Sequence, residues 1–130
     1  MYELHGSVLR NYCTRCHKFY GVDAILEAGG VPRCECGGVI KPDVVLYEES
    51  LDDTVINNAV RAIMSADTLI VGGTSLIVYP AAGLIHYYRG KNLILINKST
   101  TTADSEASLV IHEDIASVMK EAVDALEAEK

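Results

Sequence analysis

The sequence lacks a long apolar run, a basic cluster and a leader-like start. No apolar stretch approaches the roughly 20 residues that cross a bilayer, and the segment YELHGSVLRN after Met1 has neither a basic head nor an apolar core. Lys and Arg are not clustered and the formal net charge is -7, which argues against direct nucleic-acid binding. We therefore expect a cytoplasmic protein with no nucleic-acid partner and no membrane association.

Internal repeats and low-complexity stretches are also absent. A chain of 130 residues with 49% hydrophobic residues can bury one core, so we expect one domain with at most a small appended module. The excess acid is spread through residues 43–53 and 104–129. Such a surface suits a basic peptide partner, and it is also ordinary for a soluble protein.

Helical and strand-like segments alternate after residue 50. Apolar residues at helical spacing predict helices over 51–66 and 115–126, and a helix is also expected over 79–90, with Pro80 in its first turn. Uniformly apolar runs predict strands at TLIVGG, LILIN and ASLVIHED, which must be covered on both faces. This order predicts an α/β fold with a partial Rossmann-like parallel sheet and helices on both faces, because three or four strands fall short of the usual six or so.

All four cysteines lie between residues 13 and 36, and their spacing predicts a metal site. Cys13 and Cys16 enclose two residues, while Cys34 and Cys36 enclose one and precede two glycines. The spacing suits a structural zinc ion in a small zinc-ribbon module, with His17 or Glu35 as substitute ligands if the tight second pair fails. Disulfides are disfavoured in a reducing compartment, and CTRCH as a haem site leaves two cysteines unexplained. A redox pair is disfavoured because no helix follows Cys16.

Two further features remain ambiguous from their residues alone. IVGGTSL, residues 70–76, ends a strand with glycines that could cradle a phosphate or could form a plain turn. Asn97 ends the next strand, at the sheet edge where open α/β folds bind ligands. His5, His86 and His112 are each more simply explained as idle surface residues.

The segments ELHGS, CTRC, CECGGVIKPDVV, GTSLIVYPAAGL and LILIN, in this order, resemble the sirtuin family of NAD-dependent protein lysine deacylases. The resemblance covers nearly the whole chain and corresponds to the carboxyl-terminal part of the family. It implies removal of acetyl groups from protein lysines, giving nicotinamide and O-acetyl-ADP-ribose. The implied cofactors are NAD and one structural zinc ion, and the implied partners are acetylated lysine-containing proteins or peptides.

The resemblance also implies a role for individual residues. His5 matches the catalytic histidine, a general base acting on the nicotinamide ribose hydroxyls. The substrate would pair as a strand between VVLYEE and IVYP, where Glu48 stands in place of a glycine common in the family. The matching positions are, for zinc, Cys13, Cys16, Cys34 and Cys36; for NAD, Gly73, Thr74, Ser75, Asn97, Lys98, Asp114 and Ile115; and for the acyl-lysine peptide, Val45, Tyr47, Glu48 and Val78.

The family's glycine-rich GAG-S turn and Gln-Asn-Ile-Asp stretch, which shape the nicotinamide pocket, are absent from these 130 residues. We therefore expect little turnover from these residues alone, and an apolar sheet flank that favours self-association. The expected division is 1–9 and 44–130 for the carboxyl-terminal part of the nucleotide-binding domain and 10–43 for the zinc module. The competing hypothesis is a catalytically inactive, zinc-stabilised peptide-binding module.

Overall fold

The computed structural model describes residues 1–129 and divides into two compact units, Met1–Ile56 and Asn57–Lys130. The expectation of one domain with at most a small appended module stays a prediction. The boundaries predicted at residues 9/10 and 43/44 refer to a complete nucleotide-binding domain and stay a prediction.

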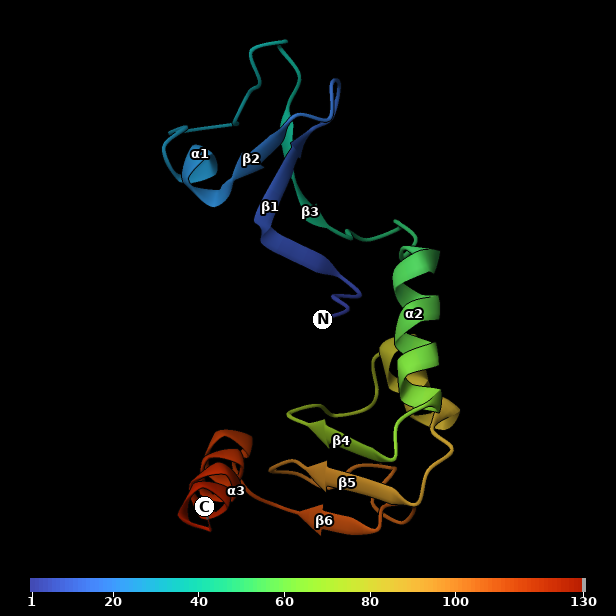
Figure 1. Cartoon of the computed structure of the whole chain (residues 1–130). Helices are drawn as coiled ribbons and strands as arrows, with labels where there is room; N and C mark the ends of the chain where they lie inside the picture. The colour runs from blue at the N-terminus through green and yellow to red at the C-terminus, as the bar shows by residue number, and fades with distance from the viewer. Residues whose placement is uncertain (130) are drawn as a thin grey trace. The chain divides into compact units, whose positions relative to one another are not determined.

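The first unit is a three-stranded antiparallel sheet with strand order β2-β1-β3 (Figure 1). Its elements are β1 (Gly6–Cys13), β2 (Phe19–Gly21), the short helix α1 (Val22–Leu26) and β3 (Ile40–Val44). The buried core consists of Cys13, Cys34 and Ile40, with Tyr20, Ile25 and Cys36 packed against it. Because so few large apolar side chains are buried, this unit depends on its cysteines for a core.

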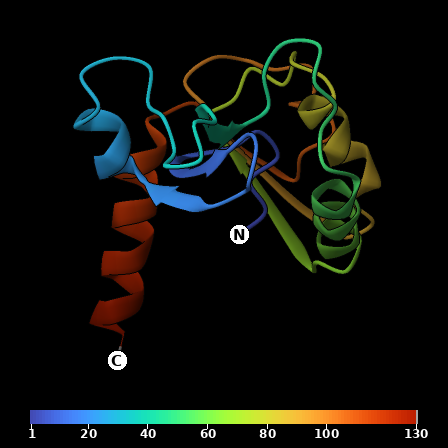
Figure 2. The same cartoon turned by 90° about the horizontal axis from the view of Figure 1, so that it is seen from above.

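The second unit holds a parallel sheet with strand order β4-β5-β6, which confirms the expected parallel arrangement (Figure 1). Its strands are β4 (Thr68–Gly72), β5 (Asn92–Ile96) and β6 (Leu109–Ile111). The helix α3 (Ile115–Ala128) and the 3-10 helix η1 (Ala81–Tyr87) lie on opposite faces of this sheet (Figure 2). The core cluster is Ile85, Leu93, Leu95 and Ala103.

The helix α2 (Asp53–Met64) crosses the boundary between the units and confirms the amphipathic helix predicted there. Asp52 caps its start, accepting hydrogen bonds from the backbone N–H groups of Thr54 and Val55 at 2.7 and 3.0 Å. In the same way Asp114 caps α3 through its Oδ1 atom. Among residues 1–129, no helix combines the length and apolar character needed to span a membrane.

The helix expected over residues 79–90 is present but shorter than predicted. The structure has a 3-10 helix at Ala81–Tyr87, and Pro80 precedes it as the N-cap residue instead of lying in its first turn. Gly83 and the aromatic residues that follow have weak α-helical preference, and short helices adopt the tighter 3-10 form readily. Gly83 also packs beneath the Tyr79 ring, where an added Cβ would lie 3.3 Å from a ring carbon.

Candidate metal centre and nucleotide-binding edge

The four cysteines meet at one point, with all four Sγ atoms within 4.8 Å of one another. The Cys13 and Cys36 sulfurs are 3.4 Å apart, and those of Cys16 and Cys34 are 3.5 Å apart. A tetrahedral zinc ion with Zn–S bonds of about 2.3 Å needs sulfurs about 3.8 Å apart. All four thiols are free, so the cluster has the donor set and the spacing to bind one zinc ion.

Turns of the backbone bring the cysteines together. In the first pair, the N–H groups of Arg15 and Cys16 donate to Cys13 Sγ at 3.3 and 3.5 Å. In the second pair, the N–H of Cys34 donates to the Gly38 carbonyl at 2.8 Å, and Gly37 adopts a φ of +83°. The one-residue spacing of Cys34 and Cys36 requires a tight turn, and the two glycines that follow supply it.

Gly38 also shapes the metal site by having no side chain. A Cβ at this position would lie 2.6 Å from Cys13 Sγ and 2.9 Å from the Cβ of Arg15. The substitute ligands considered from sequence are not part of the cluster. Glu35 instead forms an ion pair with Lys18 at 3.0 Å.

Hydrogen bonding within the cluster gives its thiols unequal acidity. The Tyr20 hydroxyl, and after it the backbone N–H of Cys36, lowers the pKa of Cys34 to about 6. That hydroxyl is buried and its contact with Cys34 falls outside ordinary hydrogen-bond geometry, so we regard it as a weak polar contact. The backbone N–H of Lys18 lowers the pKa of Cys16, but the neighbouring thiols outweigh it and raise that pKa to about 12. A divalent cation stabilises thiolates and so removes this inequality.

His5 lies on an exposed turn that is held against the segment after β3. Its carbonyl accepts a hydrogen bond from the Val45 N–H at 3.1 Å. The structure therefore brings the candidate catalytic residue next to one candidate substrate residue. Beside them is a depression of about 390 Å³ whose lining includes Glu3, Arg10 and Val45.

The other substrate candidates differ in their surroundings. Tyr47 is fully exposed, and Glu48 has a φ of +68°, in the left-handed region that favours glycine. The neighbouring carboxylate of Glu49 is occupied, because its Oε2 accepts from Lys41 Nζ and from the Leu46 N–H, both at 3.0 Å. Val78 belongs to the second unit and is exposed.

The carboxyl ends of all three parallel strands in the second unit converge on one hollow of about 240 Å³. It is lined by Gly73 after β4, by Ile96, Asn97 and Lys98 at the end of β5, and by Glu113, Asp114 and Ile115 after β6. Five of the seven NAD candidates are thus brought together. Thr74 and Ser75 follow Gly73 in the chain but do not line this hollow.

Backbone geometry and charge both shape this edge. Gly73 has a φ of +64° and donates its N–H to the Ile96 carbonyl at 3.1 Å, which joins two strand ends. A Cβ on Gly72 would collide with Ile115, so glycine lets the start of α3 approach the strand. Lys98 Nζ lies 2.9 Å from Asp114 Oδ2, and this hydrogen bond, followed by the helix-cap N–H groups, holds the pKa of Asp114 below its usual range.

Comparison with known proteins agrees with this pairing of a four-cysteine cluster and a nucleotide-type sheet edge. The profile of the Sir2 family matches residues 1–80. The chain belongs to the Sir2 family. It is 66% identical over 126 residues to an NAD-dependent protein deacetylase of Clostridium perfringens, and 58% identical over 122 residues to one of Clostridium acetobutylicum. These alignments cover 95% and 92% of this chain.

Solved Sir2 structures have the same fold. A complex described as Sir2, p53 peptide and NAD+ matches with a TM-score of 0.84 and 34% identity over 98% of this chain. A Sir2 structure bound to acetylated peptide matches with the same TM-score and 33% identity. The chain spans about half the length of its relatives, 52% and 50% of the two clostridial proteins and 55% of each Sir2 chain.

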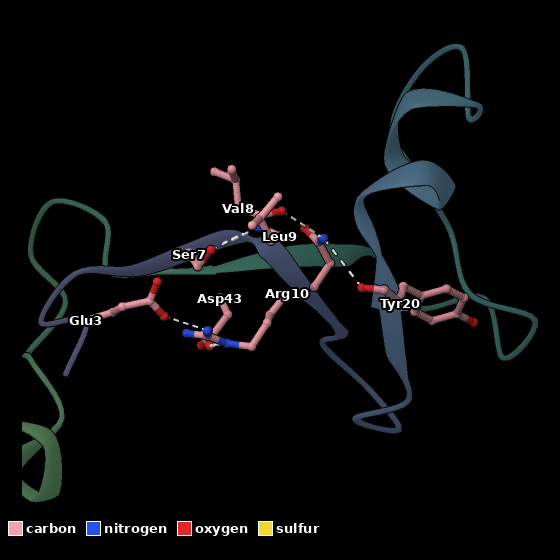
Figure 3. Close-up of polar contacts among 8 residues, drawn as sticks. Glu3, Ser7, Val8, Leu9, Arg10, Tyr20 and Asp43 are labelled. Carbon is pink, nitrogen blue, oxygen red and sulfur yellow. Dashed lines mark hydrogen bonds and ion pairs between the residues drawn. The ribbon is translucent and has the colours of Figure 1, made fainter. Parts of the chain in front are cut away.

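Sequence reasoning missed three charged residues near His5. Glu3, Arg10 and Asp43 form a connected set of ion pairs, with contacts of 2.6 and 2.9 Å (Figure 3). No motif marks them, since single charged residues in short strands are common. The sequence signal for them is weak: Glu3 lies two residues before His5, and Asp43 lies two residues before Val45.

Proposed function

We propose that these residues carry the zinc module and the carboxyl-terminal part of an NAD-dependent protein lysine deacetylase that acts in the cytoplasm. The observation that supports this most directly is the hollow where three strand ends bring together Gly73, Asn97, Lys98, Asp114 and Ile115. It lies at the edge where open α/β sheets bind nucleotides. The relatives are named for the same activity.

In this proposal each group of residues has a separate task. His5 acts as the general base that takes a proton from a ribose hydroxyl of NAD, a role that suits an exposed imidazole. The hollow holds the adenosine side of NAD, with Asn97 and Lys98 at the ribose and Asp114 with Ile115 near adenine. Gly73, Thr74 and Ser75 form the turn that contacts the phosphates.

The substrate side is proposed to use the segment after β3. Val45 and Tyr47 would contact the acetylated lysine, together with Val78, while the peptide main chain pairs with the protein main chain. Glu48, which stands where a glycine is common in the family, would also contact the peptide. The products are the free lysine, nicotinamide and O-acetyl-ADP-ribose.

Zinc is proposed to have a purely structural role. Four thiolates fill the tetrahedral coordination sphere, so no position remains for substrate. The ion would tie β1 to the loop that carries Cys34 and Cys36, and thereby support the strand that begins at Gly6, next to His5. No step of the reaction needs to pass through it.

The deciding experiment joins the amino-terminal half of the Clostridium perfringens relative to these 130 residues and measures nicotinamide release from NAD and an acetylated peptide. We expect release that depends on the peptide. His5→Ala should lower kcat by a factor of about 10² to 10⁴, the usual contribution of a general base. His86→Ala, which replaces an exposed histidine on η1, is the matched control and should retain activity.

A folded, zinc-loaded chimera that turns over equally well with and without His5 would refute the catalytic assignment. A chimera that binds acetylated peptide without consuming NAD would favour the inactive binding module. The 130-residue chain by itself is expected to release little or no nicotinamide. Its predicted self-association is checked by light scattering across a concentration series, where a constant monomer mass would contradict it.

A further inference from the structure

The strand β1 is interrupted between its His5 end and its cysteine end. Ser7 pairs with Asp43 of β3, but the next pair is Asn11 with Pro42, so residues 8–10 have no partner on β3. Pro42 has no N–H and cannot donate to the ladder. Main-chain pairing therefore does not run continuously from the metal cluster to the turn that carries His5.

The interruption has a defined conformation. Asn11 is the one buried polar residue among those described, with 1% exposure, and its Nδ2 donates to the carbonyls of Val8 and Tyr20 at 3.1 and 3.5 Å. Ser7 Oγ accepts from the Leu9 N–H at 3.2 Å. These bonds close the extra residues into a fixed bulge.

Arg10 extends from this bulge and contacts both segments that flank His5. Its Nε donates to Asp43 Oδ2 at 2.9 Å, and its Nη1 donates to Glu3 Oε2 at 2.6 Å (Figure 3). Glu3 lies two residues before His5, and Asp43 lies two residues before Val45. A planar guanidinium with several fixed donors suits such a two-way contact.

The main chain between these two segments is closely packed but sparsely bonded. Gly6 has a φ of +75° and donates its N–H to the Glu3 carbonyl at 3.0 Å. A Cβ on Gly6 would collide with the Asp43 carbonyl oxygen, so no side chain separates the strands here. One hydrogen bond, from the Val45 N–H to the His5 carbonyl, then joins His5 itself to the segment after β3.

We propose that Arg10 is a positioning residue that clamps the His5 turn onto the segment after β3 through Glu3 and Asp43. The inference rests on the proposed role of His5. The three side chains are 30 to 46% exposed, so these ion pairs contribute little to overall stability. Their effect is local, since they restrict the direction in which the turn presents its imidazole.

Amide hydrogen exchange on the zinc-loaded chain tests the clamp without any need for turnover. The reporters are the Val45 and Gly6 N–H groups, which bond the His5 and Glu3 carbonyls. Arg10→Met keeps the side-chain length and removes the charge, and we expect about 5- to 10-fold faster exchange at both reporters. The Cys13 and Cys34 N–H groups, bonded at the metal end of the same unit, should change less than about twofold.

Two further variants separate the clamp from a general charge effect. Arg10→Lys should give intermediate exchange, because one ammonium group can replace part of the forked contact. Lys18→Met removes the ion pair with Glu35 in the same unit and should leave the Val45 and Gly6 rates unchanged.

Unchanged Val45 and Gly6 exchange in Arg10→Met would overturn the inference, as would equal acceleration at Cys13 and Cys34. In the active chimera, Arg10→Met should lower kcat several-fold with the peptide KM unchanged, and a change in KM alone would also count against positioning. The two proposals fail separately. Equal turnover with and without His5 would refute the catalytic role but not the clamp. Unchanged exchange in Arg10→Met would refute the clamp but not the catalytic role.

Discussion

Gly38 offers a direct test of the geometry of the metal centre. Replacing it with alanine places a Cβ 2.6 Å from Cys13 Sγ and 2.9 Å from the Cβ of Arg15. Ordinary contacts between such atoms are about 3.5 to 4.0 Å, so both contacts are too short, each by about 0.5 to 1.5 Å. Both atoms belong to backbone-anchored groups, and Cys13 is fully buried, so the neighbours have little room to relax.

The size of the effect follows from this strain. Forcing one extra methyl group into a packed site costs about 1 to 3 kcal/mol. Because folding and zinc binding are coupled in small zinc modules, the strain appears as weaker zinc binding. With a factor of ten for every 1.4 kcal/mol or so, we expect the zinc dissociation constant of Gly38→Ala to rise about 5- to 150-fold.

Competition with a chromophoric chelator measures that constant, and Gly30→Ala is the matched control. Gly30 lies in the same unit, has an ordinary φ, and an added Cβ there meets no atom within 4 Å. Its zinc affinity should therefore stay within about twofold of the unchanged chain. If Gly38→Ala also stays within that range, the close approach of Gly38 to the Cys13 sulfur is not what shapes this site, and the reasoning fails.

Three further predictions concern the other features of the two units. Glu48→Gly should raise the free energy of unfolding by about 1 kcal/mol in denaturant titration, because glycine adopts the left-handed φ of residue 48 without strain. Glu27→Gly, at a φ of −78°, should give no gain, and equal effects of the two changes would contradict the argument. Because the pKa of Asp114 is lowered, first by Lys98, its contribution is present above the ordinary carboxyl pKa of about 4 and is lost as the pH falls below it. Exchange protection of α3 should therefore decrease on acidification and decrease less in Asp114→Asn, and an identical decrease in both would refute this. Zinc removal by a chelator should abolish amide protection in residues 10–43 but preserve it in β5. If both regions lose amide protection at the same chelator concentration, the second unit also depends on the metal.

Much of the site was predictable because its signals are local in the chain. The spacing of the four cysteines is enough to predict a zinc site, since turns of two residues can aim two thiolates at one ion. The apolar runs predict parallel strands, and parallel strands place their carboxyl ends at a shared edge. Asn97 and Gly73 were expected there for that reason, and both line the hollow.

Other features depend on atoms far apart in the sequence. Whether residues 79–90 form an α-helix or a 3-10 helix is decided by packing, as in the contact between Gly83 and the Tyr79 ring. The acidic stretch 43–53 suits a basic peptide, but the fold places Lys41 and the Leu46 N–H against the carboxylate of Glu49 within it. Thr74 and Ser75 share a motif with Gly73 but do not line the same hollow.

The sequence by itself therefore determined the cluster of four cysteines that could bind zinc, the parallel sheet and the family, because each depends on short-range spacing or on an ordered set of motifs. Only the tertiary structure decided that Arg10 lies between Glu3 and Asp43. Arg10 and Asp43 are 33 residues apart in the chain. Such a contact requires the bulge after Ser7 and the close approach of Gly6 to β3. Both arise from strand pairing, which brings together residues whose positions in the chain give no sign of contact.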